Sequence, residues 1–171
     1  GDRSGREVTG YKAEAFDIVL GKDGVKMIVV ACNTATAAAI SEMRERYPDL
    51  PIVGMEPAVK PAALTTRTGK IAVLATRGSL HGVHFARTAS QYAGRVEIIT
   101  AGGEGFVELV ESGVLSGREV RRTGEQVSEP LFSQGIDRKV LGCTHYPLLV
   151  RELRRVITGG TVEGIDPATS H

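Results

Sequence analysis

The sequence predicts an α/β protein with mainly parallel β-sheets, and three observations support this fold class. Short, continuous apolar runs, such as VKMIVVA at residues 25–31, are typical of strands that a parallel sheet buries on both faces. These runs alternate with segments of helical periodicity, which is the order that βαβ units produce. The chain has no Trp and only four Phe and four Tyr, so its core must consist of Val, Ile, Leu and Ala.

The first third of the chain is predicted to hold two helices and two strands. Val8, Tyr11, Ala15 and Ile18 recur at helical spacing and indicate an amphipathic helix. The predicted elements that follow are a strand over 25–31, an Ala-rich helix over 34–47 closed by Pro48, and a short strand at 52–53. Three prolines, Pro51, Pro57 and Pro61, then mark a candidate domain crossing.

The alternation continues through the rest of the chain. The predicted strands cover residues 71–75, 96–100 and 140–142, and the predicted helices cover residues 80–92, 106–111, 118–131 and 147–157. Gly124 weakens the third of these helices. In parallel sheets of this kind, ligands bind beyond the carboxyl ends of the strands.

Composition excludes several classes of function. Lys and Arg total 21 and Asp and Glu total 20, which gives a net charge of +1. The chain therefore lacks the excess of basic residues that is typical of nucleic-acid-binding proteins. No apolar run approaches the roughly 18 residues of a membrane span, and no signal-peptide pattern opens the chain. The prediction is therefore a cytoplasmic protein with neither a nucleic acid nor a membrane partner. Because the chain starts with Gly1 and its tail ends without a finishing element, we expect pieces to be missing at both ends.

The two cysteines occupy matching positions. VVACNT at residues 29–34 aligns with VLGCTH at residues 140–145, and each places a Cys between a strand and a helix. A helix N-terminus favours the thiolate and can also hold a carboxylate. The cytosolic prediction argues against a disulfide between Cys32 and Cys143, and two cysteines are too few for a structural zinc site, so no metal is predicted.

Two equivalent thiols suit one kind of chemistry better than others. A cysteine hydrolase needs one nucleophile and one base, and a dithiol redox pair favours closely spaced cysteines. Two acid/base groups that face each other across a substrate can remove a proton from one face of a carbon and return one to the other. The alternative is that both cysteines are buried and inert.

Four motifs resemble the glutamate racemase family, within the aspartate/glutamate racemases, and they cover nearly the whole chain in order. They are VACNTA at residues 30–35, EPAVKP at 56–61, LATRG at 74–78 and VLGCTHYPLL at 140–149. The last motif is highly specific, whereas related amino-acid racemases share the first more loosely. The resemblance implies two similar α/β lobes with the active site in the cleft between them. It places residues 1–56 and 166–171 in the first lobe and residues 57–165 in the second.

The resemblance also implies the site and the reaction. Cys32 and Cys143 match the two catalytic bases, His145 matches a residue that assists the second base, and Glu111 matches a carboxylate that supports the same side. The residues that match the substrate pocket are Gly1, Asn33, Thr34, Thr76, Thr144 and His145. The implied activity makes D-glutamate for peptidoglycan without a cofactor, with glutamate as the small-molecule partner. A homodimer is compatible with it.

Some positions depart from the family pattern. Ser79 stands where Thr is usual, which keeps the hydroxyl. Arg138 and Lys139 precede Val140 where apolar residues are expected, so the start of that strand should be exposed or short. An N-terminal Asp-Ser pair, whose Asp works beside the first Cys in the family, is not in this sequence, so the chain as given is expected to bind substrate poorly or to be inactive.

Other interpretations of the same residues stay open. A related racemase for aspartate or another small acid, or a non-catalytic interaction protein, would fit the same scaffold. His145 alone fits a satisfied polar residue, Glu111 a solvated helix carboxylate, and Thr76 a simple helix cap. His81 and His84 are predicted to lie on the surface.

Overall fold

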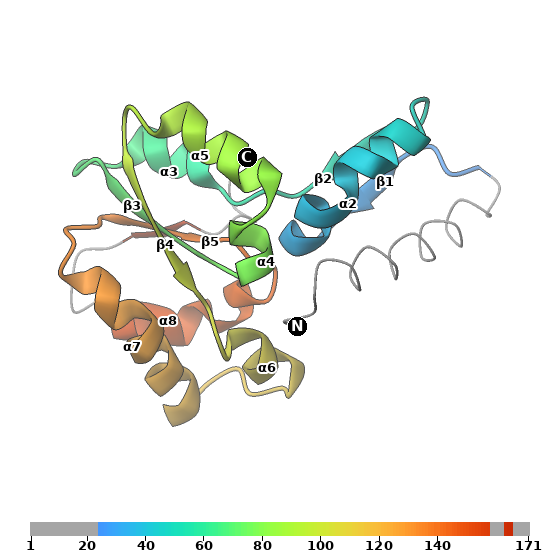
Figure 1. Ribbon diagram of the computed structural model, residues 1–171. Helices are drawn as coiled ribbons and strands as arrows, with labels where there is room; N and C mark the ends of the chain where they lie inside the picture. The colour runs from blue at the N-terminus through green and yellow to red at the C-terminus, as the bar shows by residue number, and fades with distance from the viewer. Residues whose placement is uncertain (1–23, 158–162, 166–171) are drawn as a thin grey trace.

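The computed structural model describes residues 24–157 and 163–165, which form two parallel sheets (Figure 1). The smaller sheet pairs β1 (Ile28–Val30) with β2 (Ile52–Gly54), with Ile28 opposite Ile52. Helix α2 (Asn33–Arg46) connects them, and its Ala39, Ile40 and Met43 pack with Ile52. The predicted helix around Val8 lies outside the described residues.

The larger sheet has the strand order β4-β3-β5-β6, and all of its strand pairs are parallel. The strands are β3 (Lys70–Ala75), β4 (Glu97–Gly102), β5 (Arg138–Leu141) and β6 (Glu163–Ile165). Residues 71–75 of β3 are all buried, because side chains of alternate residues point into cores on opposite faces of the sheet. The α/β fold class with parallel sheets is confirmed.

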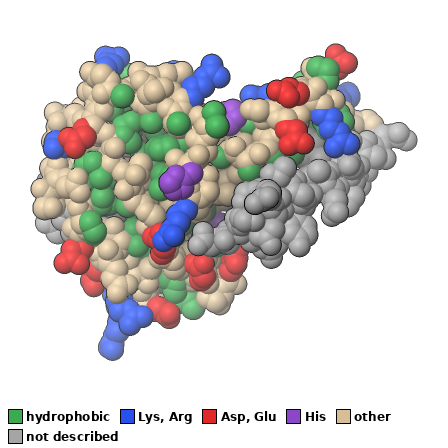
Figure 2. All heavy atoms as spheres, viewed as in Figure 1, with side chains coloured by type: hydrophobic (Ala, Val, Ile, Leu, Met, Phe, Trp, Pro, Cys, Tyr) green, Lys and Arg blue, Asp and Glu red, His purple; other side chains and the backbone are tan. Residues whose placement is uncertain are grey.

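Helices cover both faces of the larger sheet (Figure 1). One face packs against α3 (Val59–Thr65) and α5 (Val83–Tyr92). The other face packs against α6 (Phe106–Glu111), α7 (Arg118–Phe132), the 3₁₀-helix η1 (Tyr146–Leu149) and α8 (Val150–Ile157). On the molecular face shown in Figure 2, positive and negative side chains are interspersed. None of the described helices is long and apolar enough to span a membrane.

Three helix predictions need correction. The segment marked by Pro57 and Pro61 holds helix α3, because Pro61 is its third residue, where an N–H is not required for the helical ladder. The helix predicted over 80–92 is two helices, α4 (Arg77–Leu80) and α5, because the Thr76 side chain caps the first and Gly82 is the N-cap residue of the second. The helix predicted over 147–157 starts as η1, and β6 was not predicted.

The expectation for Arg138 and Lys139 is also wrong in part. Both residues belong to β5, a short strand of four residues, yet both are buried, with Lys139 only 1% exposed. The Arg138 guanidinium donates hydrogen bonds to the carbonyls of Thr65 and Asp137. Because β5 lies between β3 and β6 in the sheet, its residues are buried even where the side chain is charged. The division of the chain at residue 56 stays a prediction.

Candidate active site

Cys32 lies where the smaller sheet meets α2. It immediately precedes the first residue of α2, in an extended conformation, with a partly exposed side chain. The first turn of α2 has no side-chain cap from this position. The free thiol is therefore held at the positive end of the α2 dipole, as the sequence predicted.

Cys143 follows β5 in the larger sheet, three residues before η1, and its thiol is free and only 6% exposed. Burial raises the pKa of this thiol, and the nearby Cys32 adds to the rise, whereas hydrogen bonds from the backbone N–H groups of His145 and Tyr146 lower the pKa. The two cysteines are 111 positions apart in the sequence. Neither forms a disulfide.

His145 lies between Cys143 and Glu111. Its Nδ1 is 3.7 Å from the Cys143 sulfur, and its Nε2 is 3.7 Å from a carboxylate oxygen of Glu111. Glu111 is the last residue of α6, and its side chain is 61% exposed. The structure thus brings together three of the predicted site residues in the order thiol, imidazole, carboxylate.

Three hydroxyl groups join α2 to α4. Thr34 Oγ1 is hydrogen-bonded to Thr76 Oγ1 at 2.8 Å and to Ser79 Oγ at 3.0 Å, and the latter two are 3.1 Å apart. Thr76 also caps α4 by accepting a hydrogen bond from the Ser79 N–H. The capping interpretation of Thr76 is therefore correct, and its hydroxyl also reaches the helix that begins beside Cys32.

Asn33, the first residue of α2, is 3% exposed. Within the described part of the chain, neither its amide nitrogen nor its amide oxygen has a hydrogen-bond partner. A buried amide without partners costs free energy, so this side chain is suited to a ligand. Thr144 is half-buried next to Cys143, and the predicted substrate residue Gly1 lies outside the described residues.

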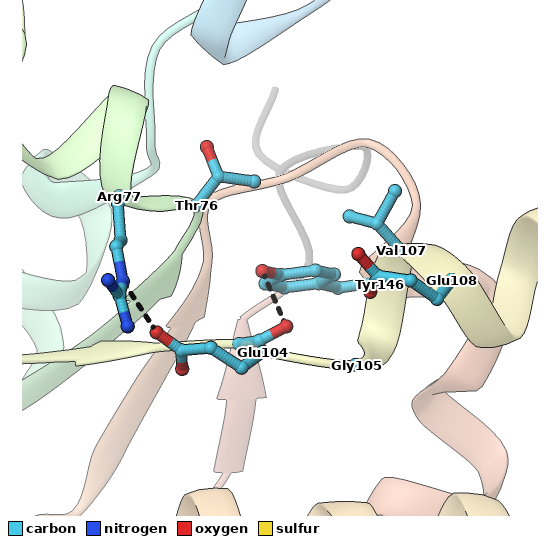
Figure 3. A pocket seen from close by; sticks show the side chains of 8 residues that line it. Thr76, Arg77, Glu104, Gly105, Val107, Glu108 and Tyr146 are labelled. Atoms are coloured by element: carbon cyan, nitrogen blue, oxygen red, sulfur yellow. Dashed lines mark hydrogen bonds and ion pairs between the residues drawn. The ribbon is translucent and has the colours of Figure 1, made fainter. Parts of the chain in front are cut away.

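A pocket of about 260 Å³ opens beside Thr76 at the carboxyl ends of β3 and β4 (Figure 3). Arg77 points toward Glu104, with 3.0 Å between Nε and Oε1, and Tyr146 lies across from them. A hydrogen bond from its own backbone and another from Arg77 lower the pKa of Glu104. Sequence reasoning did not select Arg77, Glu104 or Tyr146, although the glycine-rich stretch at residues 102–105 after a strand signals a close backbone approach.

His84 is not simply a surface residue. Its imidazole is 3.3 Å from the Ser41 hydroxyl on α2 and 3.5 Å from Glu56, and its side chain is 18% exposed. Thr88 donates a hydrogen bond to the same carboxylate. His81 is exposed, as predicted. Across residues 24–157 and 163–165, no group of three or more His, Cys, Asp or Glu residues could hold a metal ion.

Comparisons with known proteins identify relatives of this chain. The sequence profile of the Asp/Glu/Hydantoin racemase family matches residues 5–171. The chain belongs to this family. Glutamate racemase of Ectopseudomonas mendocina (strain ymp) is 53% identical over 126 residues, which are 74% of this chain and 48% of that relative. Glutamate racemase of Pseudomonas aeruginosa (strain PAO1) is 46% identical over 146 residues, covering 85% of this chain and 55% of the relative.

The fold agrees with solved structures of this racemase family. The structure of Escherichia coli glutamate racemase, in complex with L-glutamate and the activator UDP-MurNAc-Ala, superposes with a TM-score of 0.81 at 32% identity, covering 96% of this chain and 62% of that one. The Aquifex pyrophilus enzyme gives a TM-score of 0.72 at 32% identity, with coverage of 97% and 64%. The chain spans about half the length of the curated relatives it matches.

Proposed function

We propose that this protein interconverts L- and D-glutamate without a cofactor, with Cys32 and Cys143 as the two bases. The observation that carries the proposal is the pair of free thiols that follow two parallel strands, Cys32 after β1 and Cys143 after β5. The relatives named glutamate racemase, and the Escherichia coli enzyme with L-glutamate bound, support glutamate as the substrate.

The proposed reaction balances without an oxidant or reductant. One cysteine, as thiolate, takes the Cα proton, and the electron pair of the broken C–H bond moves toward the α-carboxylate. The other cysteine, as thiol, delivers its proton to the opposite face of Cα, which inverts the configuration. Because the carbon acid is weak, donors arranged in advance must stabilise the developing negative charge.

The neighbouring residues supply the other roles. His145 holds a proton at the sulfur of Cys143, and Glu111 orients the imidazole from the other side. The buried amide of Asn33 binds a polar group of the substrate. The other proposed substrate contacts are Gly1, Thr34, Thr76, Thr144 and His145. In this proposal the reaction takes place in the cytoplasm and supplies D-glutamate for peptidoglycan. A homodimer stays a prediction.

The experiment uses the full-length protein and measures the circular dichroism of L-glutamate and, separately, of D-glutamate after the protein is added. The expected result is that both solutions approach zero ellipticity, and that Cys32→Ser or Cys143→Ser stops both reactions because a hydroxyl is a far poorer base than a thiolate near neutral pH. Parallel assays with L- and D-aspartate test the aspartate racemase alternative. Racemisation that survives either substitution would disprove the two-thiol scheme, and no racemisation of any substrate would favour an interaction protein.

A further inference from the structure

Tyr146 directly follows His145 and is completely buried. Its ring meets the ring of Phe106 edge-on, with 5.1 Å between centroids and 78° between planes, a favourable aromatic geometry. Phe106 is also completely buried, and it is the first residue of α6. The ring pair therefore joins the turn that follows Cys143 to the helix that ends at Glu111.

A glycine completes this contact. The Tyr146 hydroxyl donates a hydrogen bond to the Gly103 carbonyl at 3.3 Å (Figure 3). A Cβ atom at Gly103 would collide with the hydroxyl and the ring of Tyr146, so a larger residue there would displace the ring. The loop after β4, the start of α6 and the start of η1 are thus fixed to one another.

From these contacts we infer that Phe106 and Tyr146 are positioning residues that hold His145 between Cys143 and Glu111, an inference that rests on the proposed function. His145 is only 34% exposed, and its two 3.7 Å contacts come from different elements, the β5–η1 loop and α6. The ring pair is a buried connection between the elements that carry them.

The ring pair also fixes the backbone of the turn. The N–H groups of His145 and Tyr146 lower the pKa of the Cys143 thiol, against the effect of burial and of Cys32. Tyr146 itself stays protonated, because burial first, and then Cys143, Glu104 and Glu108, raise the pKa of its phenol. If the rings lose their contact, the two N–H groups and the imidazole move away from the sulfur, and the thiolate forms less readily.

The test replaces Phe106 by Leu, which removes the ring and keeps an apolar side chain. Phe85→Leu is the matched control, because Phe85 is buried in the core on the opposite face of the same sheet. Both changes are made in a Cys32→Ser background, so that Cys143 is the only thiol. The rate of alkylation by iodoacetamide is measured against pH in the absence of substrate.

We expect Phe106→Leu to raise the pH midpoint of Cys143 alkylation by about half a unit, equivalent to about a threefold slower reaction below the midpoint. The plateau rate at high pH separates changes in access from changes in ionisation. Phe85→Leu should leave the midpoint in place. An unchanged or lowered midpoint in Phe106→Leu, or an equal rise in both variants, would overturn the inference.

Two further variants keep the test decisive. Phe106→Met carries the same expectation if the Leu variant does not fold. Tyr146→Phe keeps the ring and loses only the hydroxyl, so its midpoint should move less than that of Phe106→Leu, and an equal displacement would contradict the assignment to the ring pair. Because alkylation needs no racemisation, a shifted midpoint in a chain without activity would leave the positioning role standing while the proposed function fails.

Discussion

Lys139 is expected to destabilise the folded protein at neutral pH. Lys139 lies in β5, which pairs with β3 on one side and β6 on the other, and it is only 1% exposed. Burial lowers the pKa of its ammonium group from 10.5 to about 8. Each pKa unit is worth 1.36 kcal/mol, so holding the charge in the folded protein costs about 3 kcal/mol.

The direction of the pH dependence follows from this pKa. Below about pH 8, Lys139 is charged in both the folded and the unfolded state, so burial of the charge lowers the stability of the folded state. Between about pH 8 and 10.5 the unfolded chain binds the proton more tightly than the folded one, so the stability of the parent protein rises with pH. Lys139→Met keeps the aliphatic part of the side chain and removes this cost, so it should be more stable than the parent at pH 7, by at most about 3 kcal/mol. This advantage should shrink as the pH approaches 10.5.

The assay is urea unfolding of parent and variant, followed by far-ultraviolet circular dichroism at a series of pH values from neutral to alkaline. The control is Lys70→Met, which removes an exposed ion pair with Glu97 and should change the free energy of unfolding by less than about 1 kcal/mol. The reasoning is refuted if Lys139→Met is no more stable than the parent at pH 7, or if its advantage does not depend on pH.

Four other predictions test separate features. Asp137→Asn should destabilise the protein by about 1–3 kcal/mol in urea unfolding, because the carboxylate accepts hydrogen bonds from Thr66, Thr68 and the Arg67 N–H. Although burial raises the pKa of Asp137, these hydrogen bonds lower it overall, so the loss should disappear as the pH falls below the ordinary value of 3.8. Gly54→Ala should lower the free energy of unfolding by about 1–3 kcal/mol, because the added methyl group collides with side chains of α2, whereas Gly94→Ala, in open space, should not. His145→Asn should reduce kcat more in one direction of racemisation than in the other, as measured by initial rates. Because the equilibrium constant between enantiomers is unity, kcat/KM must fall by the same factor in both directions. Equal losses of kcat in the two directions would argue against a role of His145 on one face of the substrate. When the full-length protein works in D₂O, mass spectrometry should find deuterium at Cα of the product and little in recovered substrate, and unlabelled product would exclude two independent bases.

Much of the fold was predictable because the signals are local. Apolar runs located β3 and the end of β5, and periodicity located α2, α6 and α7 to within a residue or two. The errors lie where tertiary contacts overrule local preference. Lys139 reads as a surface residue by type, yet its place between two partner strands buries it. Helix α3 was missed because a proline within the first turn was taken as a break.

The same division holds for the candidate site. The sequence alone determined that two cysteines occupy matching strand-to-helix junctions, because that pattern depends only on neighbouring residues. Only the tertiary structure decided that His145 reaches both Cys143 and Glu111, and that Thr34 bonds to Thr76. It alone revealed the contact of Phe106 with Tyr146, since these residues are 40 positions apart and each reads by itself as ordinary core. Distances between such residues depend on how sheets and helices pack, and no local pattern encodes them.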